Sequence, residues 1–257
     1  MIGQQEFQIQ TNIEAFQSLS SQDFMAKYSS STPTPKAFFD EVGHFTTNEY
    51  DYPDLLKEIK VRRGIHLAVM GGLDPVLGQV AVANPDLTII TDVNKKAMNI
   101  SVDGRIKPIL ESEDGNDYWR RVGDYFVKVI RKIDKTRWDF PVGQDASMGG
   151  WSNPEYFDKV KQALLDGKIK WASGDMTTEG IDLGFQIARE TGVSIRLLYV
   201  SNIFDYSINS RQKFIEKLSK GIEEGLIDKN AQIIDAGLGE KGIETKVFDI
   251  SSYLQIK

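Results

Sequence analysis

The chain contains 257 residues, of which 40% are hydrophobic and 26% charged, and its formal net charge is −6. This composition supports one sizeable core, whereas the absence of cysteine excludes disulfides and thiolate metal sites, and the negative charge disfavours a nucleic-acid partner. With no apolar run of about eighteen residues and no signal-like start, the sequence predicts a cytoplasmic protein without a membrane partner. The two histidines, His44 and His66, are too few for a histidine-rich metal site, and we expect no metal.

The first sixty residues differ in character from the rest. Residues 1–31 are polar and show little periodicity, and the following S-S-S-T-P-T-P run contains prolines that oppose regular pairing. Residues 36–60 are crowded with aromatic side chains and end in a short amphipathic helix at about 54–59. We interpret residues 1–60 as an N-terminal arm, mobile or lying on the surface, followed by an aromatic flap.

A strand, a turn, a helix and a second strand follow from residue 65. The run I-H-L-A-V-M (65–70), bounded by glycines, is typical of a strand buried on both faces. Asp74 and Pro75 have the residue types of an N-cap and of the first helical position, and the helix they begin is expected to end near Asn84. The β-branched run 87–91 then predicts a strand that stops at Asp92, so residues 65–92 read as a βαβ unit.

The same alternation returns in the second half. A helix is expected from about 152 until Gly167, and another, capped by Thr178, until Gly192. Strands are predicted at 168–173, 194–200 and 232–235, a long helix before the third of these, and a last strand at 245–254, antiparallel at the sheet edge. Alternating strands and helices predict an α/β fold with a doubly wound, mostly parallel sheet in a single domain.

Residues 101–151 are not required by this alternation. They include an acidic stretch (Glu111–Asp117), a helix around residues 118–133 and a glycine-rich loop. We interpret them as an inserted helical lid over the carboxyl edge of the sheet, with a second small domain as the alternative. The acidic stretch is most simply a solvated loop.

Candidate site residues follow four predicted strands. In open α/β sheets, ligands bind outside the carboxyl ends of the strands, where the strand order reverses. Glycine allows the backbone to approach a ligand closely, and an acid at the end of the second strand can accept hydrogen bonds from ribose hydroxyls. The candidate cofactor-binding residues are Met70, Gly71, Gly72 and Asp74 after the first strand, Asp92 and Val93 after the second, Gly174, Asp175 and Met176 after the third, and Ser201 and Asn202 after the fourth.

Charge distinguishes the nucleosides that such a site could take. A dinucleotide lays its pyrophosphate on the N-terminus of the first helix, where Asp74 is expected to place its own carboxylate. The segment M-G-G-L-D-P-V-L-G also departs from G-x-G-x-x-G. A ligand with a sulfonium and an ammonium group tolerates a nearby acid, which favours S-adenosylmethionine over NAD.

At these residues the chain resembles the class I S-adenosylmethionine-dependent methyltransferases, over roughly residues 65–92 and 168–257. The resemblance implies a Rossmann-like methyltransferase fold. It also implies that Gly71 and Gly72 pass beneath the methionine portion, that Asp92 holds the ribose, that Asp175 and Met176 border the adenine, and that Ser201 and Asn202 close the floor near the methyl group. The segment 199–205 is also similar to aminocarboxypropyl transferases, which use the same cofactor.

The predicted function is therefore S-adenosylmethionine-dependent transfer, of a methyl group in the first instance, to a small-molecule acceptor. His44, shortly before the first strand, is the candidate catalytic base. Two alternatives stay open, namely a non-catalytic protein of the same fold that binds a nucleoside or a partner, and an NAD-dependent oxidoreductase. The sequence indicates neither the acceptor nor the oligomeric state.

Overall fold

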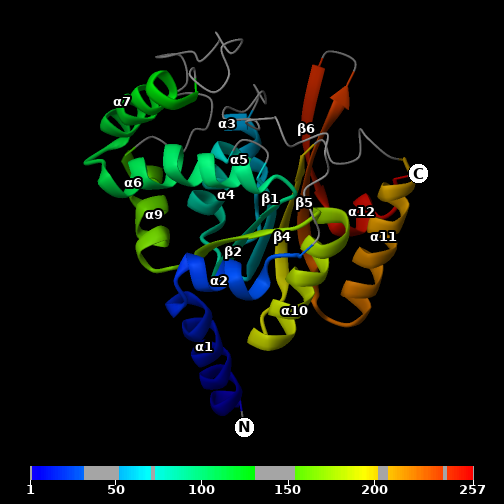
Figure 1. Ribbon diagram of the computed structural model, residues 1–257. Helices are drawn as coiled ribbons and strands as arrows, with labels where there is room; N and C mark the ends of the chain where they lie inside the picture. The colour runs from blue at the N-terminus through cyan, green and yellow to red at the C-terminus, as the bar shows by residue number, and fades with distance from the viewer. Residues whose placement is uncertain are drawn as a thin grey trace.

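The computed structural model describes residues 2–31, 52–70, 73–130, 154–201, 208–239 and 242–256. Within these ranges one six-stranded sheet is formed in the order β3-β2-β1-β4-β5-β6 (Figure 1). The first five strands are parallel, and β6 pairs with β5 in the antiparallel direction. The strands are β1 (Ile65–Val69), β2 (Leu87–Asp92), β3 (Ile169–Ser173), β4 (Ile195–Ser201), β5 (Ile227–Gly239) and β6 (Gly242–Asp249).

Helices cover both faces of the sheet, because neighbouring residues of each central strand point to opposite sides. In β2, Ile90 belongs to one hydrophobic cluster and Ile89 to the other, and in β4 Tyr199 and Leu198 divide in the same way. The first face is covered by α3 (Tyr52–Leu55), η2 (Leu56–Glu58), α4 (Asp74–Ala83), α5 (Lys95–Ser101), η3 (Val102–Ile106), α6 (Lys107–Glu111), α7 (Gly115–Tyr125), η4 (Phe126–Ile130) and α9 (Pro154–Leu165). The second face is covered by α1 (Ile2–Ser18), α2 (Ser21–Tyr28), η5 (Met176–Gly180), α10 (Ile181–Thr191), α11 (Ile208–Glu223) and α12 (Ile250–Tyr253).

The doubly wound, mostly parallel α/β sheet predicted from the sequence is confirmed, and its order is compatible with a Rossmann-like fold. The predicted strands agree with β1 to β4 to within a residue or two at their ends. The predictions for the fifth and sixth strands differ most, since β5 begins at Ile227 and β6 at Gly242, and residues 250–253 of the predicted last strand form helix α12. The helix ends at Gly167 and Gly192 are also confirmed, and both glycines have positive φ angles.

Residues 2–28 decide between the two alternatives for the N-terminal arm, because they lie on the surface of the second face as two packed helices. Residues 2–28 form α1 and α2, and Ser20 caps α2 by accepting a hydrogen bond from the amide of Asp23. Phe24 is fully buried, and Lys170 of β3 donates to the carbonyl of Gln17 at 3.1 Å. α2 therefore covers the edge strand β3. The sequence of residues 2–28 did not indicate this packing, because only one face of each helix is apolar and the segment as a whole is polar.

The described part of the segment interpreted as an inserted lid packs into the core of the first face. In residues 101–130, side chains of η3, α6, α7 and η4 enter the same hydrophobic cluster as α4 and α9. These buried side chains are Ile106, Ile109, Tyr118, Val122 and Phe126. Residues 131–151 of the predicted lid lie outside the described ranges. Among the helices in those ranges, none combines the length and apolar character needed to cross a bilayer.

Candidate functional site

The strand order reverses between β1 and β4. The crossovers from β1 to β2 and from β2 to β3 pass over the first face through α4 and α9, whereas α10 carries the chain back across the second face to β4. The segments that follow β1 and β4 therefore diverge at the carboxyl edge. Sequence reasoning placed its candidate residues at this edge.

Asp92 ends β2 at this edge and is partly exposed. It lies beside Ser173 of β3, and its backbone carbonyl accepts a hydrogen bond from Gly174 at 3.0 Å. Its carboxylate accepts a hydrogen bond from the amide of Asn94 at 2.7 Å. Burial raises the pKa of Asp92 to about 6, and the opposing group is that amide rather than a cation. A further hydrogen-bond donor at this carboxylate would therefore offset part of the cost of its desolvation.

The residues after β3 have local roles in the structure. Asp175 caps η5, accepting hydrogen bonds from the amide and the hydroxyl of Thr177, both at 2.7 Å. The helix therefore begins before Thr178, and the prediction that Thr178 caps it is wrong. Met176 is buried in the core of the second face, with its sulfur 3.7 Å from the hydroxyl of Thr91. The amide of Gly174 donates a hydrogen bond to the backbone carbonyl of Asp92. A side chain at this position would be tightly packed, since an added Cβ would lie 3.3 Å from the Cβ of Glu179.

Asp74 differs from its predicted role as an N-cap. Leu73, whose side chain makes no cap bond, is the N-cap of α4, and Asp74 is the first helical residue. The carboxylate of Asp74 instead forms an ion pair with Arg105 of η3 at 2.9 Å, and the two side chains are 5% and 1% exposed. The charge that was expected to exclude a pyrophosphate is therefore compensated by a guanidinium.

Two residues of this cluster were missed by sequence reasoning. Arg105 lies in the predicted lid, and the hydroxyl of Tyr118 lies 3.4 Å from both Arg105 and Asp74. The Arg105 guanidinium also lies over the ring of Trp119, 5.2 Å from its centroid. An arginine at an apolar position of a helix was the available signal, but nothing in the sequence identified its acid.

The remaining candidates are placed only in part. Met70 is buried in the core of the first face, and Val93 is partly exposed beside Asp92. The backbone of Ser201 pairs with Ala236 of β5. Gly71, Gly72, Asn202 and His44 lie outside the described residues, and so does the aromatic flap before residue 52.

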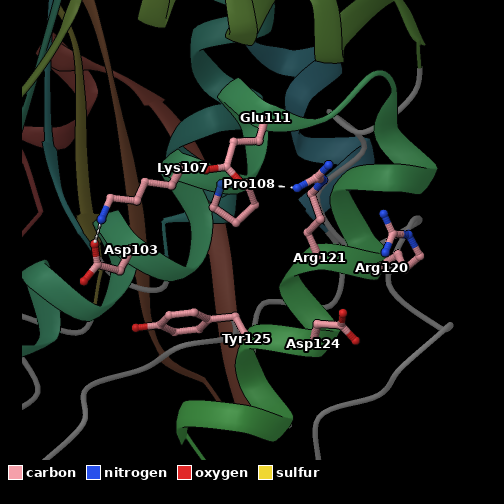
Figure 2. Close-up of a pocket in the computed structure, with 8 residues that line it drawn as sticks. All are labelled: Asp103, Lys107, Pro108, Glu111, Arg120, Arg121, Asp124 and Tyr125. Carbon is pink, nitrogen blue, oxygen red and sulfur yellow. Dashed lines mark hydrogen bonds and ion pairs between the residues drawn. The ribbon is translucent and has the colours of Figure 1, made fainter.

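A groove lies on the outer side of η3, α6 and α7, with a cavity volume of about 490 Å³ (Figure 2). Its charges are paired: Lys107 with Asp103 at 2.5 Å, and Arg121 with Glu111 at 3.2 Å. Tyr125 and Pro108 contribute to its wall. Because the ionic side chains already satisfy each other, we do not place the cofactor site here.

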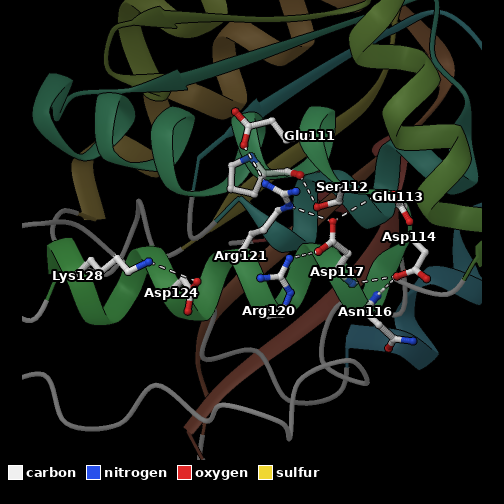
Figure 3. Close-up of polar contacts among 11 residues, drawn as sticks. Glu111, Ser112, Glu113, Asp114, Asn116, Asp117, Arg120, Arg121, Asp124 and Lys128 are labelled. Carbon is white, nitrogen blue, oxygen red and sulfur yellow. Dashed lines mark hydrogen bonds and ion pairs between the residues drawn. The ribbon is translucent and has the colours of Figure 1, made fainter.

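The acidic stretch beside this groove is ordered by helix α7 (Figure 3). Asp114 caps the helix by accepting hydrogen bonds from the amides of Asn116 and Asp117. Hydrogen bonds from Arg121 and Arg120 lower the pKa of Asp117 to about 2. The interpretation as a solvated loop is thus corrected, since these acids begin a helix and form ion pairs along it.

Fold and site together describe an α/β protein with a doubly wound sheet and a partly exposed carboxyl group of raised pKa at the edge where ligands bind in such folds. The model of a family described as a domain of unknown function (DUF7790) matches residues 143–246, which is less than half of the chain. The match includes β3, β4 and β5 but neither Asp92 nor Asp74. No curated protein matches the chain.

Proposed function

We propose that the protein binds S-adenosylmethionine at the carboxyl edge of β1 to β4 and transfers its methyl group to a small molecule. The observation that supports this most strongly is Asp92, a partly exposed carboxyl group at the end of β2 whose pKa is raised to about 6 by burial. An acid at this position of a doubly wound sheet is suited to accept hydrogen bonds from both hydroxyls of a ribose.

The chemistry of Asp92 suits a nucleoside that brings donors and positive charge. At pH 7 the carboxylate is ionised in a poorly solvated position, so hydrogen bonds from ribose hydroxyls stabilise it and lower its pKa. Binding near pH 6 should consequently release a proton. The sulfonium and ammonium groups of the cofactor outweigh its single carboxylate, so it adds no net negative charge to this edge, unlike a pyrophosphate.

Methyl transfer asks mainly for placement. The acceptor atom must lie in line with the bond from the sulfonium sulfur to the methyl carbon. A base is needed only where the acceptor carries a proton that has to leave. Few dedicated catalytic residues are required, and His44 is the residue proposed for proton removal. Transfer of the aminocarboxypropyl group would place a different carbon at the same position.

NAD is the second candidate, and two observations favour it. Arg105 compensates the carboxylate of Asp74, so the N-terminus of α4 is less hostile to a pyrophosphate than the sequence indicated. The order β3-β2-β1-β4-β5 is also that of dinucleotide-binding sheets. The two cofactors must therefore be separated by experiment.

Isothermal calorimetry at pH 7 with S-adenosylmethionine, S-adenosylhomocysteine and NAD makes this separation. We expect the two adenosyl ligands to bind and Asp92→Asn to weaken them by about 1–3 kcal/mol, the range for a lost hydrogen bond to a charged group. Asp86→Asn is the matched control, because Asp86 precedes the opposite end of β2 and pairs with Arg63.

Three results would overturn the proposal. Heat from NAD alone would favour an oxidoreductase, and no heat from any of the three ligands at submillimolar concentration would favour a non-catalytic protein. Equal weakening by Asp92→Asn and Asp86→Asn would remove Asp92 from the site.

A further inference from the structure

The first turn of α4 has an unusual backbone. Leu73, its N-cap, has φ 63° and ψ −42°, which lies outside the left-handed region that side chains other than glycine occasionally adopt. The amide of Leu73 bonds to the carbonyl of Met70 at 2.6 Å, and its own carbonyl accepts from Leu77 at 3.0 Å. Such a conformation persists only where surrounding contacts hold it, and strained residues of this kind cluster at functional sites.

The neighbouring residue is held by a dry ion pair. Asp74 contacts Arg105 at 2.9 Å, with both side chains almost fully buried, and Tyr118 lies within 3.4 Å of each. Arg105 is fixed in turn by the Trp119 ring. Because burying both charges carries a desolvation penalty close to their attraction, the pair is better explained by where it places Asp74 than by net stabilisation.

We propose that Arg105 is a positioning residue, which holds Asp74 and thereby keeps the first turn of α4 in the strained geometry that the nucleoside site uses. This inference rests on the proposed function, because α4 follows β1 at the carboxyl edge. It also assigns a role to the segment around η3 and α7, whose helices place Arg105 and Tyr118. The planar guanidinium is suited to this task, whereas a lysine ammonium does not fix an orientation.

The test uses the full chain and two readouts. Arg105→Lys keeps the charge and loses the planar fork of the guanidinium. The double variant Asp74→Asn with Arg105→Gln replaces both buried charges with neutral hydrogen-bonding groups, so it folds even if a single unpaired charge would prevent folding. The control, Asp235→Asn with Arg211→Gln, makes the same replacement in an Asp–Arg pair on the second face, where the two groups lie 3.0 Å apart. Folding is checked by thermal unfolding.

The first readout is the dissociation constant for S-adenosylhomocysteine. The second is amide hydrogen exchange, measured without ligand at Leu73 and Leu77, with Asn84 at the other end of α4 as the internal reference. In both Arg105 variants we expect binding to weaken about tenfold or more and exchange at the two amides to accelerate by a similar factor, as for a lost hydrogen bond to a charged group. Asn84 and the Arg211 control should stay near the wild type.

A folded variant with wild-type affinity, or with exchange raised equally at Leu73, Leu77 and Asn84, would overturn the positioning role. If the wild type binds no adenosyl ligand, the proposed function fails. The exchange rates at Leu73 and Leu77 still decide whether Arg105 holds this turn, so the two failures are distinguishable.

Discussion

The two faces of the sheet each contain a cluster of one aspartate, one arginine and one tyrosine, and the two clusters differ in their access to water. On the first face, Asp74 and Arg105 are 5% and 1% exposed, with Tyr118 3.4 Å from each. On the second face, Asp235 and Arg211 are 10% and 34% exposed, and the Tyr253 hydroxyl donates to Asp235 at 3.0 Å. The distances within the ion pairs are almost equal.

The two ion pairs have nearly equal lengths, but we expect their loss to change the free energy of unfolding by different amounts. Water screens and solvates the Arg211 guanidinium, so the pair on the second face contributes modestly and its loss is tolerable. On the first face neither charge reaches water, so the loss of one partner leaves the other buried without compensation. The first face also holds the strained residue Leu73, and the second face has no comparable outlier among its described residues. The dry cluster and the strained turn therefore lie together on the first face.

The largest expected effect separates the two arginines. Arg105→Met should lower the free energy of unfolding by about 3–5 kcal/mol, because the Asp74 carboxylate is left buried. Arg211→Met should lower it by about 1 kcal/mol, because water already screens the 34% exposed guanidinium and Tyr253 still donates to the Asp235 carboxylate. Urea unfolding at pH 7 measures both. Equal losses would show that exposure does not distinguish the clusters.

The next effect is the acid sensitivity of the first face. His66 of β1 is fully buried beside Gln79 of α4, and burial lowers its pKa to about 3. Below pH about 6.5 the His66 imidazole is protonated in the unfolded chain but stays neutral in the folded protein. The free energy of unfolding therefore falls as the pH decreases from 6.5 towards 3. The total loss should approach about 4 kcal/mol.

His66→Leu removes this titration, and the slope of the unfolding free energy against pH between 6.5 and 4 should flatten accordingly. Urea titrations at several pH values give the slope for wild type and variant. An unchanged slope in the variant would assign the acid sensitivity to other groups.

A smaller effect has opposite signs on stability and on binding. The raised pKa of Asp92 means that ionisation opposes folding above pH about 6, so Asp92→Asn should stabilise the free protein by about 1–3 kcal/mol at pH 7. The gain should shrink as the pH decreases from about 6 through 3.8, the ordinary pKa of the carboxyl group, and should be absent well below that value, where the group is protonated in both states. Asp86→Asn should instead destabilise, because Asp86 accepts from the amide of Gly64 at 2.8 Å. Loss of stability in Asp92→Asn would contradict the assignment.

The smallest effect compares the tyrosine hydroxyls. Tyr253→Phe should cost about 1 kcal/mol, since it removes a 3.0 Å bond to a carboxylate. Tyr118→Phe should cost less, because its contacts of 3.4 Å are long for hydrogen bonds. The ratio of the two losses, measured in urea, reports whether Tyr118 fixes the dry cluster or only fills space beside it.

The sequence by itself determined the order of strands and helices, because period-two and period-3.6 patterns and the glycine stops are local properties of the chain. It also determined that Asp92 ends a buried strand, since β-branched residues lead directly to it. The raised pKa of Asp92 was not predictable, because it depends on what surrounds the carboxyl group in space.

Only the tertiary structure decided which polar residues meet. Asp74 and Asp175 both have the residue type of a helix cap, yet Asp175 caps η5 while Asp74 turns to Arg105, 31 residues further along the chain. Likewise, α1 and α2 read as polar because each buries a single face, and their packing against α10 and β3 made them part of the core. Contacts between residues distant in sequence depend on how the layers assemble, and local patterns carry no record of that.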